Sequence, residues 1–306
     1  MQETNVDDTG SHLARELLKE KRSDRRWRNF RFIAWFALIC FALFKLSNAD
    51  TPTSPFIHGQ KYAALIRLDG MIAPGRGFSG ETVIPLLKQA FSDKSASGVI
   101  IDINSPGGTP VQAAMIHDAI LYYKKKYNKK VIVVGEDMLT SGAYYVAVAA
   151  DKIYVNPNTL TGSIGVIMKG FGFVDLIQKL GVERRVYVSG TDKDRLDPFL
   201  PQTEDDMNKI RSVMGEVQAN FAQAVTRGRQ GKLHGTPEEL FTGDFWSGDA
   251  AVKLGLVDGL GNLLDVVQSE FKTTEMKEYG GAPAFIKMLS GGMASSLDTL
   301  FYTYLS

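Results

Sequence analysis

The sequence contains a single cysteine among its 306 residues, which excludes an internal disulfide. That cysteine, Cys40, lies inside an apolar run and is neither a zinc ligand nor a nucleophile. The four histidines are scattered, and no two have the spacing of a helical zinc site. The sequence therefore predicts neither a metal site nor a cofactor.

The chain also lacks an excess of charge of either sign. It has 35 Lys and Arg against 34 Asp and Glu, a formal net charge of +1. This balance gives no reason to expect a nucleic-acid partner, because such binding needs a basic surface. A hydrophobic content of 44% and a charged content of 23% are ordinary for a globular protein of one or two domains.

The sequence has little long apolar sequence outside one N-terminal run. Its uninterrupted part, residues 32–44, is 13 residues long, whereas a membrane-spanning helix needs about 20. Flanking residues extend the run to 30–46. Eight Lys and Arg lie between Arg15 and Arg31, and almost none follow Leu46 at once, which places the N-terminus in the cytoplasm.

Two interpretations of this run remain open. Its length and the small-x-small sequence at residues 47–49 suit a cleaved signal peptide. We favour an uncleaved transmembrane anchor over residues 30–46, after a cytoplasmic segment 1–29 and before a linker 47–60. The body of the protein would then lie outside a bacterial inner membrane, in the periplasm or another extracytoplasmic space.

The order of elements after the linker indicates the fold class. Apolar strands are expected over residues 62–70, 97–104, 130–134, 152–155 and 184–188. Helices are expected over 81–91, 109–123, 172–180 and 203–229, the last opened by a capping box at Thr203–Asp206. Because strand, tight turn and helix recur, we expect an α/β domain with a largely parallel sheet over residues 61–271. Residues 272–306 form a C-terminal extension.

Ser141 lies at an expected junction between a strand and a helix. The apolar run ending at Val134 is followed by a polar turn, by Ser141-Gly142, and then by a small apolar helix. A serine at such a junction either caps the helix or acts as a nucleophile. The second interpretation gains support from a similar junction upstream.

That upstream junction is Ser105-Pro-Gly-Gly108, which ends another buried strand. Glycine allows backbone N–H groups to approach a bound oxygen. The N–H groups of Gly108 and Gly142 could then form an oxyanion hole, since carboxyl ends of parallel strands share one edge. The simpler alternative is a plain turn.

A nucleophilic serine needs a base, and the residues leave its identity open. His117 or His234 could complete a Ser-His-Asp arrangement, without local support in the sequence. A lysine works only if burial lowers its pKa from about 10.4 by roughly 3 units. The candidate lysines are Lys152, Lys169, Lys179 and Lys193.

Several segments together carry a family pattern. They are Ile103–Gly108, Thr140–Tyr145, Ala149–Tyr154, Thr161–Val166 and Phe245–Asp258. In this order they resemble the signal peptide peptidase A family of Ser/Lys proteases, in its short single-domain form, over roughly residues 60–270.

The resemblance implies a Clp protease/crotonase-like fold of repeated ββα units. It also implies that Ser141 is the nucleophile and Lys193, about fifty residues later, the general base. The neighbourhood Lys193–Asp197 is a looser match to the family pattern. Independently of the resemblance, the flanking Asp192 and Asp194 would, if close, raise the pKa of Lys193, which counts against it as the base. Finally, the resemblance implies a ring-like homo-oligomer, an octamer, with active sites at protomer interfaces.

Three functions follow from these features. The first is a membrane-anchored serine endopeptidase that degrades signal-peptide remnants and other apolar segments. The second is a crotonase-type acyl-CoA enzyme, which would not need Ser141 and which the anchor disfavours. The third is a catalytically silent scaffold of the same fold, for which Lys193 would be exposed and dispensable. The first is our prediction.

Overall fold

The computed structural model describes residues 27, 29–41 and 61–280. The chain divides into one unit from Ile57 to Gly281 and a second that holds both terminal regions. In the second unit, residues 29–41 form a helix with exposed apolar side chains. Among the residues that the structure describes, no helix has the length and apolar content needed to cross a membrane.

Parts of the expected organisation lie outside the described residues. These are the cytoplasmic segment up to residue 26, the end of the expected anchor from residue 42, the linker 47–60, and residues 281–306. Their assignments stay predictions.

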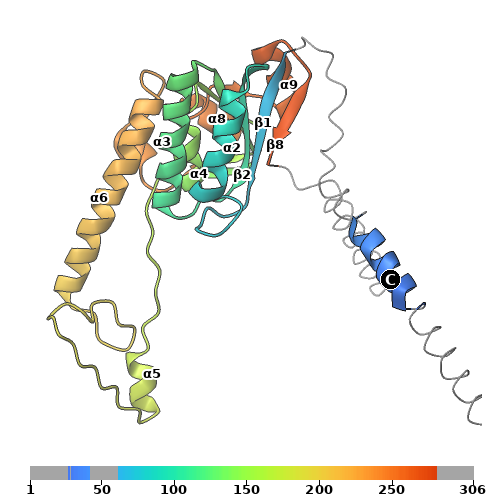
Figure 1. Cartoon of the computed structure of the whole chain (residues 1–306). Coiled ribbons are helices and arrows are strands. Elements are labelled where there is room, and N and C mark those ends of the chain that lie inside the picture. Colours follow the sequence, from blue (N-terminus) through green and yellow to red (C-terminus); the bar gives the residue numbers. More distant parts are fainter. Residues whose placement is uncertain (1–26, 28, 42–60, 281–306) are drawn as a thin grey trace, which may run out of the picture. The chain divides into compact units, whose positions relative to one another are not determined.

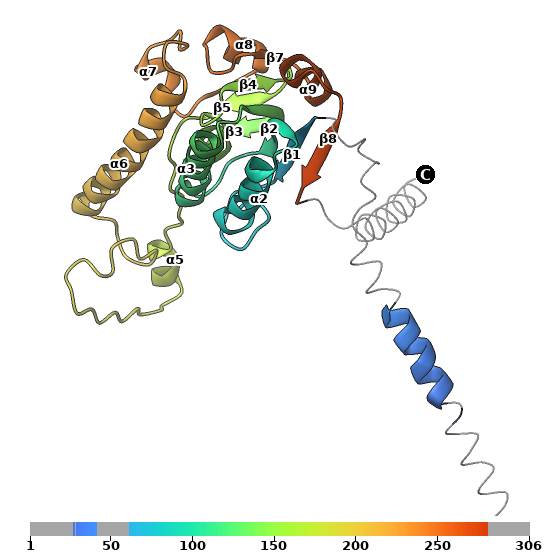
Figure 2. The ribbon, with the colours of Figure 1, turned by 45° about the horizontal axis from the view of Figure 1, so that its top comes forward.

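An eight-stranded sheet is the centre of the larger unit (Figures 1 and 2). The strand order is β6-β5-β3-β2-β1-β8, with β4 paired to β3 and β7 paired to β4. All pairs are parallel except β5 with β6. The expected α/β domain with a largely parallel sheet is therefore confirmed.

The strands are β1 (Tyr62–Asp69), β2 (Ala96–Ser105), β3 (Val131–Thr140), β4 (Lys152–Val155), β5 (Leu160–Gly162), β6 (Phe245–Trp246), β7 (Gly259–Leu260) and β8 (Met276–Tyr279). The helices are α2 (Gly80–Ser92), α3 (Pro110–Tyr127), α4 (Gly142–Ala147), α5 (Val174–Lys179), α6 (Glu204–Gly228), α7 (Pro237–Leu240), α8 (Gly248–Lys253) and α9 (Leu263–Phe271).

Local sequence explains why several of these elements begin where they do. The Ser79 side chain accepts a hydrogen bond from Thr82 N at the start of α2. The expected capping box at the start of α6 is present, between Thr203 and Asp206. The helices α2 and α3 pack against one face of the sheet, while α9 covers the other with Val266 and Val267 (Figure 1).

Three segments differ from the expectation. The strand expected to end at Val134 continues to Thr140, because β2 and β5 provide hydrogen-bonding partners. Residues 184–188 form no strand, since no neighbouring strand pairs with them, and Tyr187 is 91% exposed. Residues 276–279, placed in the C-terminal extension by sequence, form β8 beside β1 and therefore belong to the sheet.

The segment between β5 and α6 projects away from the sheet (Figures 1 and 2). We call residues 167–203 the arm. Its internal contacts include the Phe173 N–H, which donates to the Pro198 carbonyl oxygen at 2.6 Å, and the Phe173 and Phe199 rings, 5.4 Å apart. Arg184 pairs with Asp197. The arm is thus organised by its own contacts.

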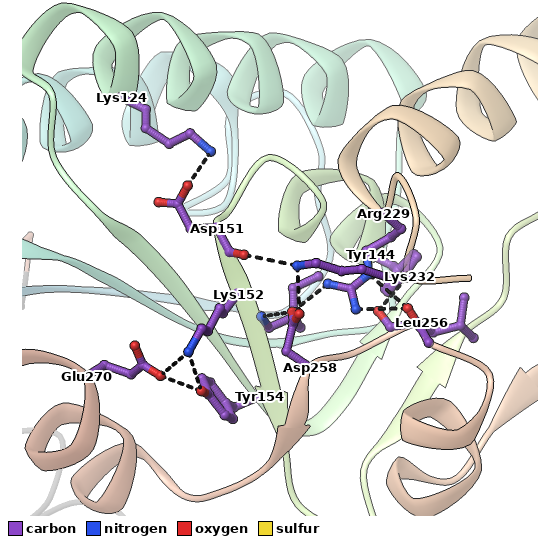
Figure 3. Close-up of polar contacts among 12 residues, drawn as sticks. Lys124, Tyr144, Asp151, Lys152, Tyr154, Arg229, Lys232, Leu256, Asp258 and Glu270 are labelled. Atoms are coloured by element: carbon purple, nitrogen blue, oxygen red, sulfur yellow. Dashed lines mark hydrogen bonds and ion pairs between the residues drawn. The ribbon is translucent and has the colours of Figure 1, made fainter. Parts of the chain in front are cut away.

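A buried polar network ties the end of α6 to the sheet (Figure 3). The Arg229 side chain is 2% exposed and donates from Nε and Nη2 to the Gly255 carbonyl oxygen, at 3.0 and 2.8 Å. It also pairs with Asp258, whose carboxylate accepts from Lys232 at 2.7 Å. Burial opposes ionisation, but these hydrogen bonds hold the pKa of Asp258 below its usual value.

The segment 255–258, which contains Gly255 and Asp258, also holds the helix that follows Ser141. The Tyr144 hydroxyl in α4 donates to the Leu256 carbonyl oxygen at 2.6 Å, and the Ile153 N–H in β4 donates to Asp258 at 2.8 Å. The network therefore joins α4, α6 and β4 through one short segment.

We expect Arg229→Met to lower the free energy of unfolding by about 3–5 kcal/mol, because it leaves the half-buried Asp258 without its main partner. Denaturant unfolding of the full chain measures this. The matched control is Arg185→Met, whose pair with Glu183 is solvent-exposed and should change stability little. Equal losses in the two variants would contradict the expectation.

Candidate active site

Ser141 joins β3 to α4 in a strained backbone conformation. Its φ is 54° and its ψ is −125°, a region that residues other than glycine rarely adopt. The strain is held by two backbone hydrogen bonds, from Ser141 N to Gly162 O at 2.8 Å and from Tyr145 N to Ser141 O at 3.0 Å. The hydroxyl makes no capping hydrogen bond. The structure therefore does not support the interpretation of Ser141 as a helix cap.

The Ser105–Gly108 loop packs directly against Ser141. A Cβ on Gly107 would lie 2.7 Å from both the Gly142 nitrogen and the Ser141 Cβ. A Cβ on Gly108 would lie 2.0 Å from the Ile72 carbonyl oxygen. Backbone hydrogen bonds of Ile72 with Gly107 O (2.8 Å) and Thr109 N (2.9 Å) fix this approach. Only glycine permits such contact.

The expected oxyanion donors lie side by side. A Cβ on Gly142 would be 3.3 Å from the Gly108 nitrogen, so the two peptide groups are neighbours. Within the described part of the chain, neither N–H donates to another protein group. Two adjacent, unpaired N–H groups beside a serine hydroxyl can stabilise an oxygen that becomes negatively charged.

Ser141 opens into an apolar pocket of about 740 Å³ between α3 and α6. One face of α3 and one face of α6 supply most of its wall, so the pocket follows both helices away from Ser141. Its apolar lining includes Val111, Ala113, Leu121, Tyr145, Val217 and Phe221. Such a lining suits an apolar peptide side chain.

His117 also lines this pocket, which local sequence did not indicate. The imidazole is largely buried, its Nδ1 lies 2.9 Å from Asp118 Oδ1, and its ring centroid is 5.1 Å from that of Tyr145. No hydrogen bond among the described residues joins it to the Ser141 hydroxyl. His234 is exposed and lies outside the pocket.

Lys193 lies elsewhere, in a turn of the arm. Its side chain is exposed and is not part of the pocket lining. The turn is fixed by the neighbouring Arg195, which pairs with Asp192 at 2.9 Å and Asp205 at 2.8 Å. Within one chain the structure brings together Ser141, Gly108 and Gly142, but not Lys193.

The other candidate lysines are not suited to be a base in this chain. Lys152 bonds to Glu270 at 2.8 Å, and this carboxylate raises the pKa of the lysine (Figure 3). Lys169 and Lys179 are exposed in the arm.

Comparison with known proteins identifies the family of the chain. The model of peptidase family S49 matches residues 123–277, half of the chain, which include Ser141 and Lys193. The chain belongs to peptidase family S49. The resemblance to the signal peptide peptidase A family is confirmed by relatives of this S49 chain.

An Na(+)/H(+) antiporter NhaA of Brucella melitensis is 42% identical over 68% of this chain and 29% of its own length. An Enterococcus faecium protein provisionally named signal peptide peptidase SppA is 32% identical over 65% of this chain and 58% of its own. Protease 4 of Haemophilus influenzae is 31% identical over 67% and 33%. The chain thus spans less than two thirds of each relative. Family and names together support a serine-type peptidase.

A solved structure, a serine-to-alanine mutant of a membrane-bound stomatin-specific protease, covers 73% of this chain and 99% of its own. Its TM-score is 0.48 and its sequence identity 14%.

We expect Gly107→Ala to lower kcat about 10²–10³-fold, because the new Cβ pushes Gly142 away from its place beside Gly108. Peptide hydrolysis by the full chain measures the loss, with thermal unfolding as a check on folding. Gly77→Ala is the control, since a Cβ there meets nothing within 4 Å. An unchanged kcat in folded Gly107→Ala would show that the two junctions need not touch.

Proposed function

We propose that the protein is a membrane-anchored serine endopeptidase that cleaves signal-peptide remnants and other apolar peptide segments. The observation that carries this proposal is the strained Ser141, which lies beside two unpaired N–H groups in the lining of an apolar pocket. Membership of peptidase family S49 supports it.

In the proposed reaction the Ser141 hydroxyl attacks the scissile carbonyl carbon while a neutral base removes its proton. The N–H groups of Gly108 and Gly142 bind the resulting oxyanion. The base then protonates the leaving amine, and water hydrolyses the acyl-enzyme. No cofactor, metal or nucleic acid takes part.

The proposed base is Lys193 of a neighbouring copy in a ring-like homo-oligomer, an octamer by family resemblance. In a single chain the Lys193 side chain is exposed to solvent. The arm that carries it exposes large apolar side chains, including Ile167 (73%), Phe171 (82%) and Tyr187 (91%). Several large apolar side chains exposed on one segment favour a protein interface. Burial in an interface lowers the pKa of a lysine in general, and a lysine base requires this.

The proposed location is a bacterial inner membrane, with a single span over residues 30–46 and a cytoplasmic N-terminus. The basic residues before the apolar run support this orientation. The catalytic domain would lie in the periplasm or another extracytoplasmic space.

A second candidate function is a catalytically silent scaffold of the same fold. The exposed position of Lys193 in a single chain is the observation that favours it. A crotonase-type acyl-CoA enzyme has less support, because nothing in that chemistry requires the strained Ser141.

We expect Ser141→Ala and Lys193→Ala each to abolish hydrolysis of an apolar signal-peptide-like substrate without dissociating the oligomer. Steady-state turnover and light scattering measure the two properties. His117→Gln serves as the comparison and should retain turnover. If Lys193→Ala is active and His117→Gln is not, the base is His117. If the wild-type protein cleaves no substrate, the catalytically silent scaffold becomes the favoured function.

Mixing the two inactive variants tests whether Lys193 acts across an interface. Co-assembled Ser141→Ala and Lys193→Ala chains should recover about a quarter of wild-type turnover, because each heterologous interface has one chance in four of pairing an intact serine with an intact lysine. A base within the same chain predicts no recovery at all. Separately assembled variants, combined only before the assay, are the control.

A further inference from the structure

The strand β3, which ends just before Ser141, contains a bulge. Along β2 and β3 the pairing is regular up to Ile103 with Gly135, and it resumes with Ser105 opposite Leu139. Between these two pairs β2 has one residue, Asn104, whereas β3 has three, Glu136–Met138. The extra length lies in Glu136–Met138, and pairing resumes two residues before Ser141. A bulge of this kind redirects the strand that contains it.

One side chain bridges this bulge. Asn104, in β2, accepts a hydrogen bond at its Oδ1 from the Met138 N–H at 3.2 Å. Its Nδ2 donates to Asp137 Oδ2 at 3.4 Å, and its backbone carbonyl oxygen accepts from the Gly70 N–H at 2.9 Å. Asn104 thus replaces the ladder hydrogen bonds that the bulge interrupts, while its own backbone is held by the loop after β1.

The position of the bridge matters because each strand leads to one half of the active site. Asn104 immediately precedes the Ser105–Gly108 loop, where Ser105 Oγ accepts a hydrogen bond from Gly107 N at 3.1 Å. Met138 lies three residues before Ser141. The Ser105–Gly108 loop and the turn at Ser141 are in close contact, since a Cβ on Gly107 would be 2.7 Å from Ser141 Cβ. A small slip of β3 along β2 would separate Gly108 N–H from Gly142 N–H.

We propose that Asn104 is a positioning residue. By bridging the bulge in β3, it fixes β3, which leads to Ser141, against β2, which leads to the Ser105–Gly108 loop. This inference rests on the proposed function of Ser141, Gly108 and Gly142. It assigns Asn104 no contact with substrate; its role is to hold the two oxyanion donors in register.

The surroundings of Asn104 are strongly acidic, which makes its neutral amide significant. The ionisable groups on this part of the sheet are Arg67, Asp69, Asp102, Glu136, Asp137 and Glu278. Asp102 is 2% exposed and bonds to Arg67 through Oδ2. Burial and repulsion from Glu136 raise the pKa of Asp102 to about 7. A carboxylate in place of the Asn104 amide would lose the donor to Asp137 and add repulsion that grows with pH.

Two variants test the role of Asn104. Asn104→Ala removes both side-chain hydrogen bonds, and we expect kcat to fall at least tenfold with KM changed less than threefold. Asn104→Asp keeps the shape and the acceptor for Met138 N–H. Its kcat relative to wild type should fall further as the pH rises from 6 to 8.5, whereas the Asn104→Ala ratio should stay flat. Asn158→Asp, at an exposed asparagine with no side-chain hydrogen bond among the described contacts, is the matched control.

Hydrogen exchange provides a readout that does not depend on catalysis. Amide exchange over residues 136–143 should quicken at least tenfold in Asn104→Ala and remain at the wild-type rate in Asn158→Asp. Wild-type turnover in Asn104→Ala, or a loss shared equally between kcat and KM with exchange unchanged, would overturn the proposal. If the wild-type protein shows no Ser141-dependent hydrolysis, the proposed function fails, while the exchange result still decides whether Asn104 holds the bulge.

Discussion

The structure depends on one close contact, between the Ser105–Gly108 loop and the turn at Ser141. The peptide groups on the two sides lie so close that a single methyl group on Gly107 would contact the Gly142 nitrogen at 2.7 Å. Close packing of this kind leaves little freedom for either segment. The contact joins the ends of β2 and β3, at Ser105 and Thr140. It also explains why Ser141 tolerates a backbone conformation with φ of 54°.

The elements around this contact hold it from several directions. On one side α3 begins at Pro110, two residues after Gly108, and contacts α4, so the loop is fixed by the helix that follows it. Beneath α4, Tyr144 and the Arg229–Asp258 pair connect the turn to α6 and β4 (Figure 3). Before the turn, Asn104 bridges the bulge in β3. Local strain at Ser141 is thus balanced by packing and hydrogen bonds that are distributed over the whole domain.

The arm has the opposite character. Its side chains contact one another, yet many large apolar groups face solvent, and the expected base lies on it. Ser141 and the N–H groups of Gly108 and Gly142 lie together within one chain, whereas Lys193 lies apart from them. In the proposed oligomer the interface would bury Lys193, which a single chain leaves exposed. Catalysis would then depend on contact between copies.

The sequence by itself determined the elements that depend on local signals. The capping box at Thr203 and the order of strand, turn and helix predicted α6, α3 and the parallel sheet, because hydrogen bonds and periodicity of neighbouring residues specify them. The sequence also predicted that the Ser105–Gly108 loop and Ser141-Gly142 would lie close together, because the carboxyl ends of parallel strands share one edge of the sheet.

Only the tertiary structure decided the features that need a distant partner. The continuation of β3 to Thr140 and the addition of β8 depend on neighbouring strands, and residues 184–188 are no strand because they have none. His117 enters the pocket of Ser141 through the packing of α3 against α4, which no local motif encodes. The backbone conformation of Ser141 depends on the packed Ser105–Gly108 loop, and the bulge in β3 depends on the pairing of β3 with β2. Sequence specifies local conformation through near neighbours, whereas the geometry of the site results from contacts between residues far apart in the chain.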